Sequence, residues 1–181
     1  MSCDRANSRE WPLSHPTLRV ETLLREPLLA VVPAGHPLAR RTRIPLAALA
    51  GETFALFPRH RAPAFYDAIT SCCRQAGFAP RIAHEAADWQ VLVSLVAAGL
   101  AVTLAPASVR RMPRAGVRYR PIQPARAIAE LVLLYAPARG SPLTEVFLRV
   151  ARETARGMTA ASRAVSRLPY NAAVLISRTQ P

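Results

Sequence analysis

Short apolar runs separated by proline and glycine dominate the chain, and they predict a sheet of buried strands. The clearest is residues 28–32, a continuous Leu-Leu-Ala-Val-Val run that ends at Pro33. Continuous apolar runs of this length are typical of strands buried on both faces. The runs with strand character are residues 18–24, 28–32, 53–57, 81–85, 100–105, 116–122 and 131–135, and we expect residues 116–122 to form an edge strand.

Segments with helical spacing lie between and after these runs. The first spans residues 63–76 and is bounded by Pro63, which suits a first helical turn, and Gly77, which suits a C-terminal cap. The second follows Asp88, a residue type that caps helix N-termini, and the third spans residues 142–156. The third helix collects apolar side chains on one face: Leu143, Val146, Phe147 and Val150. Strands alternating with helices indicate an α/β fold with mostly parallel sheets.

Composition narrows the class of protein. Of the 181 residues, 51% are hydrophobic and 19% are charged, which excludes a disordered chain. The net charge is +13, and all 24 cationic side chains are arginine, which we attribute to codon bias. No acid occurs between Asp88 and Glu130, where the basic stretch lies: Arg110, Arg111, Arg114, Arg118, Arg120 and Arg126. We interpret this stretch as a solvated rim, with a phosphate-contacting surface as the alternative.

Cysteine and histidine positions give no sign of metal or catalytic chemistry. Cys3, Cys72 and Cys73 are too few for a disulfide framework or a four-cysteine zinc site. Patterns of the HExxH, GxSxG, Walker A and GxGxxG types are absent from the sequence, so we predict no enzyme, no metal and no cofactor. His36 lies in a Gly-His-Pro-Leu turn, whose geometry we expect it to support.

Targeting signals are also missing from the sequence. The first residues lack the apolar core of a secretory signal. Residues 91–107 are apolar, but Gly99 and Pro106 interrupt them, so we expect a helix and a strand rather than a membrane span. We therefore expect a cytoplasmic protein with no membrane contact.

Several motifs occur in an order that resembles one family. Residues 26–39 read Glu-Pro-Leu-Leu-Ala-Val-Val-Pro-Ala-Gly-His-Pro-Leu-Ala, and residues 77–80 read Gly-Phe-Ala-Pro. Residues 93–102 read Val-Ser-Leu-Val-Ala-Ala-Gly-Leu-Ala-Val. Together with residues 48–54 and 141–148, these segments resemble the effector-binding half of LysR-type transcriptional regulators.

The resemblance, which extends over about residues 18–156, implies a periplasmic-binding-protein-like (type 2) fold of two α/β lobes with an effector between them. The segments it implies are an irregular segment (1–17), a partial first lobe (18–41 and 124–157), a complete second lobe (42–123) and a flexible tail (158–181). The family's helix-turn-helix and the first elements of the first lobe have no counterpart before residue 18. The first 17 residues match no family segment, which indicates a mis-called start, a frameshift or a degraded gene.

The resemblance places effector contacts at the edge of the second lobe. The candidates follow the strand at 53–57, precede the helix after Asp88, or end the strand at 100–105: Phe57, Pro58, Arg59, His60, Ala87, Asp88 and Pro106. Open parallel sheets bind ligands beyond the carboxyl ends of their strands, where helix N-termini favour anions. Arg59 and His60 there favour a carboxylate. The alternative is that both are ordinary solvated side chains and that Asp88 only caps a helix.

We therefore interpret the chain as the ligand-sensing domain of a LysR-type regulator that binds a small anionic metabolite. DNA contact is expected only through a missing N-terminal helix-turn-helix, and the full-length form is expected to be a homo-oligomer. Because half of the cleft wall has no counterpart, we expect weak or no effector binding by this chain alone, and uncovered apolar surface. The alternatives are an arginine-rich stand-alone nucleic-acid-binding protein and a non-functional regulator fragment; a periplasmic solute-binding protein is disfavoured by the missing signal peptide.

Overall fold

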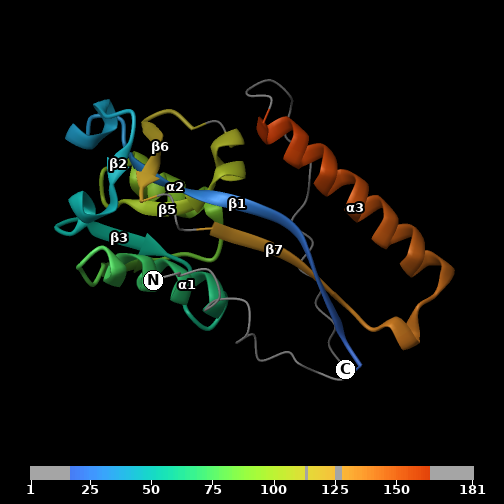
Figure 1. Ribbon diagram of the computed structural model, residues 1–181. Coiled ribbons are helices and arrows are strands. Elements are labelled where there is room, and N and C mark those ends of the chain that lie inside the picture. Colours follow the sequence, from blue (N-terminus) through green and yellow to red (C-terminus); the bar gives the residue numbers. More distant parts are fainter. Residues whose placement is uncertain (1–16, 113, 125–127, 164–181) are drawn as a thin grey trace.

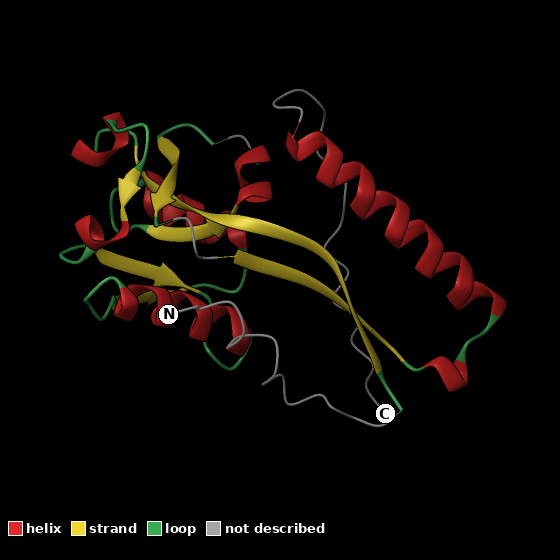
Figure 2. Cartoon of the chain, viewed as in Figure 1, coloured by secondary structure: helices red, strands yellow, loops and turns green. Residues whose placement is uncertain are grey.

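The computed structural model describes residues 17–112, 114–124 and 128–163, and the structural statements below concern these residues. The strands are β1 (Arg19–Pro33), β2 (Ile44–Pro45), β3 (Thr53–Leu56), β4 (Arg81–Glu85), β5 (Thr103–Pro106), β6 (Val117–Gln123) and β7 (Ile128–Tyr135). The α-helices are α1 (Pro63–Gln75), α2 (Trp89–Ala97) and α3 (Pro142–Arg163), and the 3-10 turns are η1 (Pro37–Arg40), η2 (Leu46–Leu49), η3 (Ala107–Arg111) and η4 (Pro137–Arg139). Figure 2 shows most of these elements gathered at one end, with α3 alongside a long pair of strands.

The longest strand, β1, belongs to two sheets in succession (Figure 1). Its first half pairs antiparallel with β7, and this pairing ends with Pro27 opposite Ile128. Its second half, from Leu28, lies between β5 and β6. The sequence predicted two strands interrupted at Glu26 and Pro27, whereas the structure has one. Proline is tolerated here because Pro27 stands where β1 changes partners, so its missing N–H interrupts neither ladder.

Away from β1, some strands of this lobe pair in parallel. Strand β3 pairs with β4 in parallel and reaches β5 through a parallel bridge between Phe54 and Val102. The Ala55 N–H donates to the Val102 carbonyl at 2.9 Å, which joins the two groups of strands. The order across this lobe is therefore β4, β3, β5, β1, β6, β2. The expectation of mostly parallel sheets was wrong for β1, which is antiparallel to β5, β6 and β7, and β6 is an inner strand because β2 covers its outer edge.

Helices α1 and α2 cover opposite faces of this sheet. Neighbouring residues of a strand point to opposite faces. Ala30 of β1 packs in one apolar cluster with Ile69 of α1, and Val31 packs in another with Val93 of α2. Each of these side chains is fully buried, so the lobe has a core on either side of one sheet.

Helix α3 lies along the paired strands β1 and β7 (Figure 1). It buries Leu148 and Ala155. The predicted apolar face points away from the rest of the described chain, with exposed fractions of 77% for Leu143 and 47% for Phe147. Residues 148 and 155 lie on the opposite side of a helix from this face because the period is 3.6 residues. Helix α3 therefore has two apolar faces, of which the described residues cover one.

Helix α3 ends beyond the predicted limit, at Arg163, within the segment expected to be a flexible tail. The remainder of that tail and most of the predicted irregular N-terminal segment lie outside the described residues. Among the described helices, none combines the length and the hydropathy that crossing a bilayer requires.

Candidate functional site

The candidate site lies where β3, β4 and β5 end at one edge of the sheet. Phe57 and Pro58 follow β3 directly, and Ala87 lies just beyond β4. The Ala86 N–H donates to the Leu56 carbonyl at 3.1 Å, so the strand ends that carry these residues are adjacent. Pro106 is the last residue of β5, which runs parallel to β3 on its other side.

Three aromatic rings meet at this edge. Phe57 follows β3, Phe65 lies in the first turn of α1, and Trp89 opens α2. The ring centroids of Phe57 and Trp89 are 4.9 Å apart, those of Phe65 and Trp89 5.7 Å, and those of Phe57 and Phe65 6.3 Å. We name Phe57, Phe65 and Trp89 the aromatic triad. The sequence analysis missed Phe65 and Trp89, although an aromatic residue in the first turn of each helix was a readable signal.

Arg59 forms an ion pair with a residue of the same lobe. Its Nε and Nη2 atoms donate to the two carboxylate oxygens of Asp67 in α1, at 2.8 and 3.0 Å. The hydrogen bond from Arg59 holds the pKa of the Asp67 carboxyl below its ordinary value, and the same bond raises the pKa of Arg59. Both side chains are exposed, so the pair is screened by solvent. The Arg59 guanidinium therefore already has a carboxylate partner within its own lobe.

His60 and Arg61 follow Arg59 and are both exposed. Neither forms an ion pair with an acid in the described ranges. Helix α1 begins just beyond them at Pro63, without a side-chain cap and without an acid in its first turn. Positive potential at this edge therefore comes from Arg61 and from the start of α1.

Asp88 caps α2, as predicted. Its Oδ1 atom accepts a hydrogen bond from the Val91 N–H at 2.8 Å. An aspartate at this position satisfies one of the free amides of the first helical turn.

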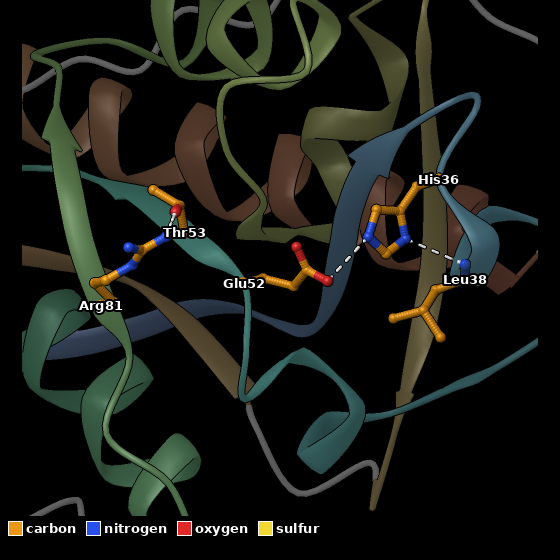
Figure 3. Close-up of polar contacts among 5 residues, drawn as sticks. All are labelled: His36, Leu38, Glu52, Thr53 and Arg81. Atoms are coloured by element: carbon orange, nitrogen blue, oxygen red, sulfur yellow. Dashed lines mark hydrogen bonds and ion pairs between the residues drawn. The ribbon is translucent and has the colours of Figure 1, made fainter.

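The Gly-His-Pro-Leu turn has a structural role, which confirms the prediction for His36. The His36 Nδ1 atom accepts a hydrogen bond from the Leu38 N–H at 3.1 Å (Figure 3). The imidazole must therefore carry its proton on Nε2, which donates to Glu52 Oε1, also at 3.1 Å. The turn is thereby tied to the residue that precedes β3. Figure 3 also shows Arg81 of β4 donating to the Thr53 hydroxyl of β3.

The arginine-rich stretch contacts the protein's own backbone at two of its positions. Arg120 donates from Nε to the Ala39 carbonyl at 3.1 Å, and Arg118 donates to the Val117 carbonyl at 3.0 Å. Four arginines of the stretch are exposed: Arg110, Arg111, Arg114 and Arg118. Arg126 lies outside the described residues.

Comparison with known proteins identifies the family. A family model described as the LysR substrate binding domain matches residues 3–156. The chain belongs to the LysR substrate-binding domain family. The match begins at residue 3. The expectation that the first 17 residues match no segment of the family was therefore wrong for residues 3–17.

A curated relative is consistent with this family. The HTH-type transcriptional regulator IlvR of Caulobacter vibrioides is 39% identical over 136 residues, which are 75% of this chain and 45% of IlvR. The chain thus spans less than half the length of the curated relatives that it matches first. These relatives are named as transcriptional regulators rather than enzymes, and the family match favours a ligand-sensing domain over an arginine-driven nucleic-acid-binding protein.

Solved structures of the LysR family share the fold. CbnR, a LysR family transcriptional regulator, superposes with a TM-score of 0.68 and 26% identity over 78% of this chain and 49% of CbnR. The effector-binding domain of BenM with its effector benzoate gives a TM-score of 0.67 at 23% identity, over 89% of this chain and 73% of that domain. The fold is therefore the predicted periplasmic-binding-protein-like fold of LysR effector-binding domains.

Proposed function

We propose that this chain is the ligand-sensing part of a LysR-type transcription regulator and binds a small carboxylate at the joint end of β3, β4 and β5. The convergence at one sheet edge of the aromatic triad, the start of α1 and two basic side chains without an ion-pair partner among the described residues, His60 and Arg61, carries this proposal. Apolar walls with a few placed polar groups are typical of small-molecule sites. Residues 42–123 are the second lobe in this proposal, and residues 28–33 of β1 run through its sheet.

Each candidate residue has a distinct role in the proposal. Phe57, Pro58 and Pro106 form apolar wall, and Ala87 leaves room between the strand end and α2. His60 and Arg61 attract the carboxylate, while Arg59 positions the loop through its two bonds to Asp67. Asp88 shapes the site by capping α2.

Signalling, in this proposal, is a population shift between lobe arrangements rather than a reaction. A ligand shifts such an equilibrium only through different affinity for its two states. Strand β1 is continuous between the two parts, so their relative motion requires β1 to bend, and Pro27 marks the change of partners. Glu26, beside it, accepts a hydrogen bond from the Ser108 N–H at 2.8 Å, just after β5. A ligand that moves the end of β5 would thereby act directly on the crossing strand.

The partners of the whole protein are part of the proposal. A longer form would reach DNA through a helix-turn-helix upstream of this chain, act as a homo-oligomer and work in the cytoplasm, where a bacterial chromosome lies. A non-functional fragment of such a regulator is the alternative. The intact mass of the natural product separates the two: a mass well above that of this chain supports the regulator, and a mass equal to it supports the fragment.

Backbone amide NMR during titration tests ligand binding directly. Acetate, succinate, shikimate and benzoate are added separately, and we expect at least one to shift amides of residues 57–66 and 87–91 with a millimolar dissociation constant. Replacing His60 and Arg61 together by alanine should weaken that binding about threefold or more, whereas the Arg40→Ala/Arg41→Ala control should not. If none of the four compounds changes the chemical shifts of these amides, the proposal is contradicted. Micromolar affinity would contradict the expectation that half of the site is missing.

A further inference from the structure

Strand β1 carries the chain from an extended arm into the second lobe (Figure 1). We name residues 19–27 of β1, together with β7 and α3, the arm. The pairing of β1 with β7 ends at Pro27, opposite Ile128, and its pairing with β5 begins one residue later, at Leu28 opposite Pro106. The arm and the lobe therefore join along one line that crosses β1.

Proline occupies three positions along this line. Pro27 lies in β1, and Pro106 of β5 and Pro121 of β6 lie opposite the first two lobe residues of β1. Proline has no N–H, so none of these positions can supply a backbone hydrogen-bond donor where the two parts join. Sheet regions with fewer backbone hydrogen bonds open and bend more easily than the rest of a sheet.

A side chain connects the two parts at the same place. Glu26, the residue before Pro27, accepts a hydrogen bond at its Oε2 atom from the Ser108 N–H, at 2.8 Å. Glu26 belongs to the arm, where it lies opposite Ala129 of β7, whereas Ser108 lies in η3, directly after β5. N–H groups in the first turn of a helix have no partner within it, and η3 begins without a side-chain cap of its own. The Glu26 carboxylate therefore links the arm to a backbone group of the lobe.

The Glu26 carboxylate differs from the other acids of its strand pair. Glu21 and Glu130 each bind an arginine of the arm, whereas Glu26 forms no ion pair among the described residues. This difference is notable in a chain with 24 arginines. Glu26 is also half-buried, and a hydrogen bond from a backbone N–H to a carboxylate is stronger than one between neutral groups. The contact with Ser108 is therefore the interaction that holds this side chain.

We infer that the hydrogen bond between Ser108 and Glu26 is a latch that fixes the orientation of the arm on the second lobe. The three prolines make the join easy to bend, and the latch holds it in one arrangement. A movement at the end of β5 that displaces Ser108 releases the arm. The use of the latch in signalling rests on the proposed function, but the latch itself requires no ligand and is tested without one.

Hydrogen exchange and residual dipolar couplings, both measured by NMR on the full chain, test the latch. All proteins carry Val146→Gln/Phe147→Gln, because exposed apolar side chains of α3 favour association. Glu26→Ala should speed exchange of the Ser108 amide about tenfold, as expected when one charged hydrogen bond is removed. The couplings of the arm and of the lobe should fit one alignment tensor before this substitution and require two tensors after it.

Two further variants separate the hydrogen bond from other effects. Glu26→Gln keeps an acceptor oxygen at the same reach, so it should keep one tensor and exchange Ser108 within about threefold of the parent rate. Glu130→Ala is the matched control, because Glu130 is an acid of the same strand pair but contacts Arg25 within the arm. It should leave both measurements unchanged. If Glu26→Ala does not fold, Glu26→Asp replaces it with the same expectation, since it keeps the charge and loses one methylene of reach.

The outcomes separate the latch from the proposed function. A single tensor for arm and lobe in Glu26→Ala would overturn the latch, whatever the carboxylate titration shows. Two tensors in Glu26→Gln or in Glu130→Ala would overturn the assignment to the Ser108 hydrogen bond. The proposed function depends on the carboxylate titration, which this experiment does not include.

Discussion

Glu21 of β1 and Arg152 of α3, which are 131 positions apart in the sequence, form a two-point ion pair. Arg152 donates from Nε and Nη2 to the two carboxylate oxygens, at 2.8 and 2.7 Å. The hydrogen bond from Arg152 holds the pKa of Glu21 below its ordinary value of 4.5. Leu148 and Ala155 are the buried apolar residues of α3 in the described chain, and the ion pair of Glu21 with Arg152 adds a polar contact between α3 and β1.

Glu21→Gln should lower the free energy of unfolding above about pH 5 and have little effect near about pH 3. A carboxyl whose pKa is lowered by folding contributes stability above its unfolded pKa, and that contribution disappears as the pH falls through the folded value. Urea denaturation of both proteins at the two pH values measures the difference. Glu130→Gln is the control, because Arg25, its partner at 2.9 Å, is more exposed. An equal loss from Glu21→Gln at both pH values would contradict the assignment.

Thr103→Val should stabilise the protein by about 1 kcal/mol, because a buried hydroxyl without a partner costs free energy. Thr103 of β5 is fully buried, and its hydroxyl makes no hydrogen bond to any described residue. Thr103→Ser is the informative control: it keeps the hydroxyl, loses a methyl group and should destabilise by about 1 kcal/mol. The same sign for both variants in urea denaturation would show that the hydroxyl is satisfied in solution.

His36→Ala should destabilise the protein by about 1–2 kcal/mol, since it removes the acceptor for the Leu38 N–H and the donor to Glu52. Glu52→Gln retains an acceptor oxygen and should cost less than about 0.5 kcal/mol. His84→Ala removes another half-buried imidazole and serves as the comparison. Thermal unfolding ranks the three variants, and a His36→Ala midpoint above that of His84→Ala would argue against the structural role.

The open face of α3 should make the chain self-associate at micromolar concentration. Large exposed apolar patches on soluble proteins mark contact surfaces or aggregation sites. In the described chain, the first half of β1 pairs only with β7. The exposed apolar residues include Leu131 and Leu134 of β7, and Val146 and Phe147 of α3.

Sedimentation velocity of the chain and of the Val146→Gln/Phe147→Gln variant checks this expectation. The double variant should shift the distribution toward monomer, whereas Arg149→Gln, on the same helix, should not. A natural chain that is monomeric throughout the micromolar range would show that this face does not drive association.

Local chemistry made much of the fold predictable from the sequence. Strand β4 has the predicted limits, α1 begins at Pro63, and Asp88 caps α2. Capping, the fixed φ of proline and apolar periodicity act within a few residues, so one sequence is sufficient to read them. The ordered motifs also predicted the family and the edge of the sheet at which Phe57 lies.

Only the tertiary structure decided which of these elements meet. Continuity of β1 through Pro27 depends on where β7 ends and β5 begins, and the aromatic triad depends on two helices packing on opposite faces of one sheet. The two-point contact of Arg59 with Asp67, which lies about one helix turn into the next element, was likewise not readable from the sequence. The sequence determined residue types and local periods, whereas pairing between distant residues depends on the free energy of packing the whole chain.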